Sequence, residues 1–128
     1  MKLYYNQGYF IPIAISNPLK KARYPERGAV LALIDTGFDG FLLIPKDIFQ
    51  AVQAIPVEKA TIEGVCCETT AIVAPIRIII EELNLAIDGE CITYEESKEI
   101  IIGLEALSKL EITLNGCLRK GTTKRCHT

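Results

Sequence analysis

Short apolar segments, each broken after a few residues by Gly, Pro or Asp-Gly, are the feature of this sequence that most restricts its fold. From residue 57 onward they follow one another closely, over 57–64, 65–80, 83–89 and 90–97. Runs rich in Val, Ile and Thr that are bounded by turn residues are typical of β-strands joined by hairpins. We therefore predict an all-β arrangement for this part of the chain.

The N-terminal part combines similar strands with one short helix. Residues 8–16 indicate a strand, and Pro12 places it at a sheet edge because proline has no N–H to donate to a neighbour. Residues 29–34 are apolar without interruption, which predicts a strand buried on both faces. Pro45 suits the first turn of a helix, and the spacing of the apolar residues predicts that helix over 45–54.

The C-terminal part adds a buried strand, a second short helix and a closing hairpin. We expect the strand over 98–103, the helix over 104–110 and the hairpin over 111–121, with its turn at Asn115-Gly116. Asn-Gly is the strongest short-range hairpin signal. Many short strands, two short helices and no regular alternation of strand and helix predict a small β-barrel or a β-sandwich.

The size and composition of the chain are those of one globular domain. It has 128 residues, of which 49% are hydrophobic and 23% charged, as is ordinary for a domain that buries a core. It contains no apolar run long enough to span a membrane, and its first residues lack the pattern of a signal peptide. These features predict a cytoplasmic protein with no membrane partner.

The cysteines and the single histidine limit the chemistry that the chain can perform. The five cysteines are Cys66, Cys67, Cys91, Cys117 and Cys126. They show no C-x-x-C spacing, and His127 is the only histidine. Zinc sites use paired ligands at short spacings, and Cys/His or Ser/His catalysis needs a histidine within the fold. We therefore predict reduced thiols, no metal and no cofactor, and we expect any catalysis to depend on carboxylates.

Basic residues are concentrated at the two ends of the chain, although the net charge is only −2. Residues 1–28 hold five Lys or Arg, and residues 119–128 hold four and no acid. These charges are not interleaved with aromatic residues in the manner of a nucleic-acid-binding surface. We therefore interpret 119–128 as a basic flexible tail and predict no nucleic-acid partner.

One carboxylate directly follows the apolar segment 29–34, in the tripeptide Asp35-Thr36-Gly37. An unpaired charge among apolar residues is costly, so Asp35 needs a compensating partner. Further along, the tripeptide Ile101-Ile102-Gly103 places two apolar residues and a glycine at the start of the second predicted helix. A simpler interpretation of Asp35 is that its carboxylate caps backbone N–H groups of its own turn.

This pair of motifs, Asp-Thr-Gly after an apolar strand and a later Ile-Ile-Gly, resembles the retropepsin-like (clan AA) aspartic protease family in its single-domain prokaryotic form. The resemblance covers residues 8–118 and implies that 1–118 form one retropepsin-like aspartic protease domain. It also implies a small closed acid-protease barrel with one or two short helices. In this family the two motifs build a ψ-shaped floor of the active site, so Ile101, Ile102 and Gly103 are expected to be structural residues of that floor.

The resemblance implies hydrolysis of peptide bonds by a homodimer. Aspartic proteases use two carboxylates about 3 Å apart that share one proton and activate a water molecule. This chain has one Asp-Thr-Gly, so each of two copies has to supply one Asp35. The family's roles assign catalysis to Asp35, Thr36 and Gly37, with Thr36 bracing the two loops and Gly37 offering its N–H to the carboxylate. The expected substrate is a polypeptide.

The same resemblance places substrate contacts at Asp39 and in a flap hairpin whose tip lies near Gly64. Two features depart from the family pattern. Leu104 stands where an arginine usually follows the second glycine, and Phe38 stands where a small residue is usual. These departures favour an alternative hypothesis, a non-catalytic dimer of the same fold that binds extended peptides or acts as an interaction module.

Overall fold

The structure is a computed structural model of the 128-residue chain, and it describes residues 1–63 and 68–126. The strands are β1 (Tyr4–Tyr5), β2 (Tyr9–Ser16), β3 (Arg23–Tyr24), β4 (Val30–Ile34), β5 (Leu42–Leu43), β6 (Glu58–Glu63), β7 (Glu68–Ile80), β8 (Leu85–Thr93), β9 (Ile101–Ile102), β10 (Leu110–Asn115) and β11 (Lys120–Arg125). The helices are α1 (Lys46–Ala51), the 3₁₀ turn η1 (Glu81–Leu83) and α2 (Leu104–Leu107). No helix in the described ranges has the length and apolar character needed to cross a membrane.

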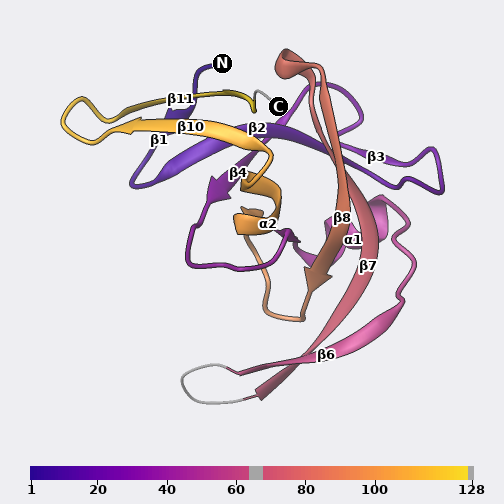
Figure 1. The fold of residues 1–128 in the computed structure, drawn as a ribbon. Helices are drawn as coiled ribbons and strands as arrows, with labels where there is room; N and C mark the ends of the chain where they lie inside the picture. Colours follow the sequence, from indigo (N-terminus) through magenta and orange to yellow (C-terminus); the bar gives the residue numbers. More distant parts are fainter. Residues whose placement is uncertain (64–67, 127–128) are drawn as a thin grey trace.

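Six of the strands close into a barrel, which Figure 1 shows with β7 and β8 forming its long curved wall. The order around the barrel is β2, β4, β9, β5, β8, β7 and back to β2. The pairs β4–β9 and β5–β8 are parallel, and the other pairs in the ring are antiparallel. Closure leaves no open edge within the ring. The predicted all-β, small closed barrel with two short helices is therefore confirmed for the described residues.

Isoleucines at alternate positions of two neighbouring strands fill much of the barrel. The fully buried ones are Ile11, Ile13 and Ile15 on β2 and Ile76, Ile78 and Ile80 on β7. Side chains along a strand point alternately to its two faces, so this period of two directs one face of each strand inward. Full burial of each such side chain contributes about 1.5–3 kcal/mol relative to exposure. The hydrophobic pattern of these two strands therefore determines which face becomes the core.

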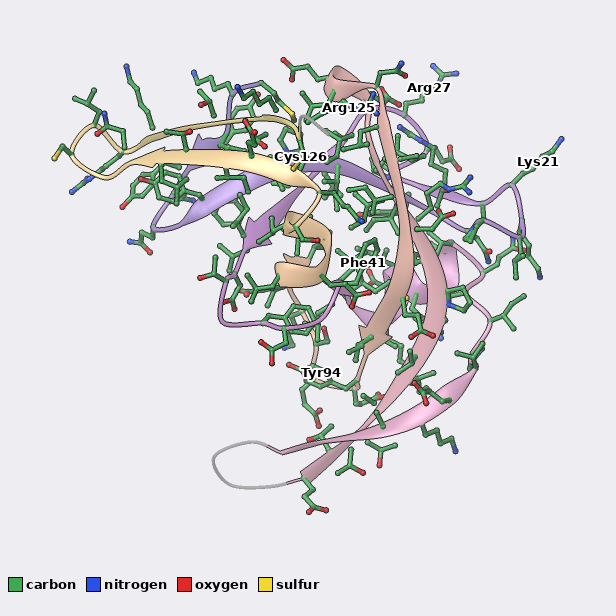
Figure 2. The ribbon with its side chains drawn as sticks, viewed as in Figure 1. Lys21, Arg27, Phe41, Tyr94, Arg125 and Cys126 are labelled. Atoms are coloured by element: carbon green, nitrogen blue, oxygen red, sulfur yellow. The ribbon has the colours of Figure 1, made fainter. Side chains whose placement is uncertain are left out.

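Asp88-Gly89 lies inside a strand, so the prediction of separate strands on either side of it is wrong. β8 runs through this pair, and the chain turns between β7 and β8 at η1 and Asn84, whose φ is 50°. Gly89 is required because a Cβ atom there would lie 2.6 Å from the ring of Phe41. Figure 2 shows Phe41 between α2 and β8. Asp88 is exposed and forms an ion pair 2.6 Å long with Arg77 on β7.

β2 is a central strand, and the prediction from Pro12 of a sheet edge is wrong. β2 has β4 on one side. On its other side β1 pairs as far as Phe10, and β7 pairs from Ala14 onward. Pro12 falls in the gap between these two partners. Proline has no N–H to donate, so it fits wherever the neighbouring strand is locally absent. Such a gap also occurs beside a central strand.

Residues 120–125 form a strand, so the prediction of a flexible tail over 119–128 is wrong for this segment. β11 pairs with β10 along its whole length, so the predicted hairpin forms, but its loop is residues 116–119 and the predicted turn at Asn115-Gly116 is wrong. On its other side β11 bonds to the start of the chain, where Met1 and Thr123 exchange two hydrogen bonds of 2.9 and 3.1 Å. Figure 1 shows β11 and the start of the chain at the top of the molecule. The basic segment is thus held by backbone hydrogen bonds on both sides.

β4 is buried on one face only, which corrects the prediction of burial on both faces. Ala32 is fully buried, whereas 46% of Leu31 is exposed and Leu33 is half-buried. Leu31 and Leu33 line a pocket of about 550 Å³, together with Phe10 and Ile100. The uninterrupted apolar sequence therefore identified the strand correctly, but the chain does not cover the outer face of that strand.

Candidate active site

The loop that carries Asp-Thr-Gly leaves the end of β4 and is held by β9. These two strands run parallel. The Asp35 N–H donates to the Ile102 carbonyl oxygen over 3.1 Å, and the Leu33 N–H donates to the Ile100 carbonyl oxygen over 2.8 Å. The two motifs singled out in the sequence therefore lie side by side, although many residues separate them along the chain.

Gly103 fastens the far side of the same loop. Its N–H donates to the Phe41 carbonyl oxygen over 3.0 Å, and the next two N–H groups donate to the Phe38 and Gly40 carbonyl oxygens over 2.9 and 3.2 Å. The first N–H groups of a helix have no acceptor within the helix, so the loop supplies the acceptors that α2 needs. Glycine is required here by close approach: a Cβ atom would collide with the Gly40 carbonyl oxygen and lie 2.7 Å from that of Phe38.

The Phe38 side chain braces the loop by packing over two glycines. A Cβ atom on Gly40 would lie 2.6 Å from Phe38 Cζ, and one on Gly103 would lie 2.6 Å from Phe38 Cδ2. Neither glycine can therefore be enlarged unless the ring moves. The sequence marks Phe38 as unusual for the family but does not predict this packing. The available signal was a large ring between Gly37 and Gly40.

The Asp35 side chain is half-buried, which corrects the expectation of a carboxylate enclosed by apolar residues. Its Oδ1 accepts the Gly37 N–H over 2.8 Å, as the motif predicts. The Asp35 carbonyl oxygen also accepts the Phe38 N–H over 3.2 Å. These contacts suit a catalytic carboxylate and equally suit a carboxylate that caps its own turn. Within one chain, Asp35 is stabilised by a backbone donor and by solvent rather than by a partner charge.

The residues around Asp35 are open to solvent. Thr36, Gly37 and Asp39 are exposed, and 43% of Leu104 is exposed at the start of α2. No ion pair among the described residues includes Asp39, in agreement with the absence of an arginine after Gly103. The catalytic roles of Asp35, Thr36 and Gly37 and the substrate role of Asp39 remain predictions.

The predicted flap corresponds to the hairpin of β6 and β7. These strands pair from Glu58–Val73 to Glu63–Glu68, and Figure 1 shows the hairpin projecting from the barrel. Its predicted tip, Gly64, lies outside the described residues, as do Cys66 and Cys67. The structure therefore provides the arms of the hairpin, and the substrate contact assigned to Gly64 remains a prediction.

The chemistry available at this loop is that of carboxylates, Asp35 and Asp39. In residues 1–63 and 68–126, no three His, Cys, Asp or Glu side chains gather into a group that would hold a metal ion. A carboxylate accepts a proton when ionised and donates one when protonated, so a single ionised carboxylate supplies the base but not the acid. A hydrolytic site based on Asp35 therefore needs a second proton-transfer group.

Comparisons with known proteins support the fold. No protein-family model matches the sequence. An uncharacterized protein of Archaeoglobus fulgidus is 35% identical over an alignment of 127 residues, which covers 91% of this chain and 93% of that protein. The solved structure of EIAV protease complexed with the inhibitor HBY-793 matches with a TM-score of 0.57 at 16% identity, covering 82% of this chain and 91% of that one. The retropepsin-like barrel is therefore confirmed as the fold of the chain.

Proposed function

We propose that this chain, which belongs to the same protein family as the uncharacterized Archaeoglobus fulgidus protein, is a cytoplasmic aspartic endopeptidase. The proposal starts from the fold that the chain shares with a retroviral protease. Two copies associate about a twofold axis, and each supplies one Asp35. The pair of carboxylates activates a water molecule, which attacks the carbonyl carbon of a peptide bond in an extended polypeptide.

The observation that carries this proposal is the way in which the Asp35 loop is built. β9 pairs with β4 and β5, the strands at the two ends of the loop, and the start of α2 donates N–H groups to its carbonyl oxygens. An ordinary turn needs none of these long-range bonds. Preorganised loops on a rigid scaffold are typical of catalytic sites, because the reacting group must keep one position.

The exposure of the loop supports pairing with a second copy. Thr36 and Gly37 are exposed beside Asp35, and the apolar Leu104 is 43% exposed where its N–H bonds to the loop. Contact between two such loops about a twofold axis brings like residues together. Two carboxylates that meet in this way share one proton, so that one acts as the base and the other as the acid.

Each motif residue has a distinct role in this mechanism. The ionised Asp35 takes a proton from the attacking water, and the protonated Asp35 of the other copy donates to the carbonyl oxygen of the substrate. The Gly37 N–H, 2.8 Å from Asp35 Oδ1, holds the carboxylate in place. Thr36 bonds across the axis and opposes the repulsion between the two loops. Asp39 and the hairpin near Gly64 hold the substrate backbone.

The experiment is cleavage of an unfolded protein or a peptide library at mildly acid pH. Asp35→Asn should abolish cleavage, because an amide neither takes nor shares the proton. Asp47→Asn, which changes an exposed carboxylate on α1, is the matched control and should retain the wild-type rate. Equal cleavage by wild type and Asp35→Asn would show that the activity does not depend on this residue.

A second candidate function is binding of extended peptides without cleavage. Leu104 in place of an arginine leaves Asp39 without the usual guanidinium partner, and Phe38 fills space beside the motif. Tight peptide binding without turnover across a broad pH range would favour this function. The same binding by wild type and Asp35→Asn would support it further.

A further inference from the structure

A second pocket, separate from the Asp35 loop, lies between α1 and the base of the β6–β7 hairpin. Its volume is about 490 Å³, and none of residues 35–40 lines it. Phe49, Ile55, Pro56 and Ile72 form an apolar wall. This size and lining fall within the range of small-molecule sites, which combine apolar walls with a few polar groups.

One of the polar groups in this pocket is a buried hydroxyl without a partner. Thr93 lines the pocket and is only 1% exposed. Its Oγ1 has no hydrogen-bond partner, and it is the one buried side-chain oxygen or nitrogen in this condition among the described residues. Buried polar atoms in native proteins are nearly always hydrogen-bonded, so each exception calls for an explanation. A ligand that bonds to Thr93 supplies one.

The rim of the pocket is positively charged. Lys20 and Lys46 line it together with the amides of Gln50 and Gln53, and no carboxylate of the described residues lines it. Lys46 Nζ lies 2.9 Å from Glu95 Oε2 in an exposed ion pair, so Lys20 contributes the more available charge. Lys20 forms no ion pair among the described residues, so its charge favours an anionic group at the rim.

We propose that this pocket binds an acylated apolar α-amino acid with a free carboxylate. The carboxylate lies against Lys20 and Lys46, and the apolar side chain packs against Phe49 and Ile72. The amide of the ligand exchanges a hydrogen bond with Thr93 Oγ1. A free N-acyl amino acid and the C-terminal residue of a peptide share this chemistry. The proposal does not depend on the activity of Asp35.

The test is binding of N-acetyl-L-phenylalanine to the intact protein, followed by NMR or calorimetry. We expect saturable binding in the millimolar range or tighter for a ligand of this size. The uncharged N-acetyl-L-phenylalaninamide should bind at least about fivefold more weakly, because it lacks the charge that the lysines attract. A short peptide ending in phenylalanine distinguishes the two sources: equal affinity indicates a peptide C-terminus, and failure to bind indicates a small metabolite.

Three variants separate the proposed contacts from general effects. Thr93→Val removes the unpartnered hydroxyl and should weaken binding at least about fivefold without loss of folding stability. Lys20→Gln changes an exposed residue of this pocket and should also weaken binding. Lys98 is an exposed lysine that lines the pocket beside Leu31 and Leu33 instead, so Lys98→Gln should leave the affinity unchanged. Absence of binding by wild type, or identical affinity in wild type, Thr93→Val and Lys20→Gln, would overturn the proposal.

Discussion

Replacing Gly103 by alanine tests how tightly the Asp35 loop is held by the start of α2. The φ of Gly103 is −106°, which alanine adopts without strain, so the effect isolates the close approach of backbone atoms. The added methyl group would collide with the Gly40 carbonyl oxygen and lie 2.7 Å from the Phe38 carbonyl oxygen. Both of those oxygens accept hydrogen bonds from α2.

The expected loss of stability combines two contributions. Overpacking of a tightly filled site costs about 1–3 kcal/mol. Displacing the loop also weakens the three hydrogen bonds donated by the N–H groups of residues 103–105, each worth about 1 kcal/mol. We therefore expect a fall of about 3–5 kcal/mol in the free energy of unfolding, which is a large share of the stability of a small domain.

The assay is urea unfolding followed by circular dichroism, with Gly116→Ala as the matched control. A Cβ atom on Gly116 meets nothing within 4 Å, so that variant should change the free energy of unfolding by less than about 0.5 kcal/mol. A Gly103→Ala protein as stable as the Gly116→Ala protein would refute the close packing of the loop against α2.

Three further predictions concern other parts of the fold. Asn17→Ala should lower the free energy of unfolding by about 2 kcal/mol in urea melts, because the Asn17 side chain donates to two backbone carbonyl oxygens at the end of α1. The hydrogen bond from Arg77 lowers the pKa of Asp88 in the folded protein. The pair therefore stabilises the fold at a pH above the Asp88 pKa of the unfolded chain, and this stabilisation is lost as the pH falls through the lower Asp88 pKa of the folded protein. NMR titration of Arg77→Gln should show the Asp88 pKa returning toward its ordinary value. Burial raises the pKa of Cys91 to about 12, so iodoacetamide at neutral pH should label the exposed Cys117 and leave Cys91 unmodified until the protein unfolds.

The all-β class was predictable because most strands are short, apolar and separated by turn residues. That pattern left a barrel and a sandwich open, and the closed barrel followed from the family resemblance. The errors arose where tertiary contacts override a local signal. Asp88-Gly89 has the composition of a turn, yet it lies inside β8. There the Phe41 ring packs against Gly89, which has no side chain, and Asp88 forms an ion pair with Arg77 on the neighbouring strand. Pro12 indicated an edge, yet a gap between β1 and β7 accommodates it. Neither contact is visible from neighbouring residues alone.

The polar composition of the C-terminal segment concealed a strand. Lys120, Thr122 and Lys124 are exposed, while Gly121 and Thr123 are buried. This alternation carries no apolar signal, and the strand forms because β10 and the N-terminal residues supply backbone partners on its two sides. Pairing between distant segments of this kind depends on the whole fold, so a search for hydrophobic periodicity does not detect it.

The candidate site was predictable as a pair of motifs but not as a structure. The resemblance brought Asp35 and Gly103 together, and the hydrogen bonds of the loop agree with that placement. It did not predict that the Asp35 carboxylate is half-buried or that Phe38 packs over Gly40 and Gly103. Those features depend on the packing of α2, which the sequence motif does not describe.

The central claim is that one active site uses Asp35 from each of two copies, and mixing of subunits tests it most directly. Wild-type and Asp35→Asn proteins are unfolded together in different proportions, refolded, and assayed for peptide cleavage. If both carboxylates are needed, activity falls as the square of the wild-type fraction, so an equal mixture retains about one quarter of the activity. A linear fall, with about half of the activity left in the equal mixture, would contradict a shared dyad.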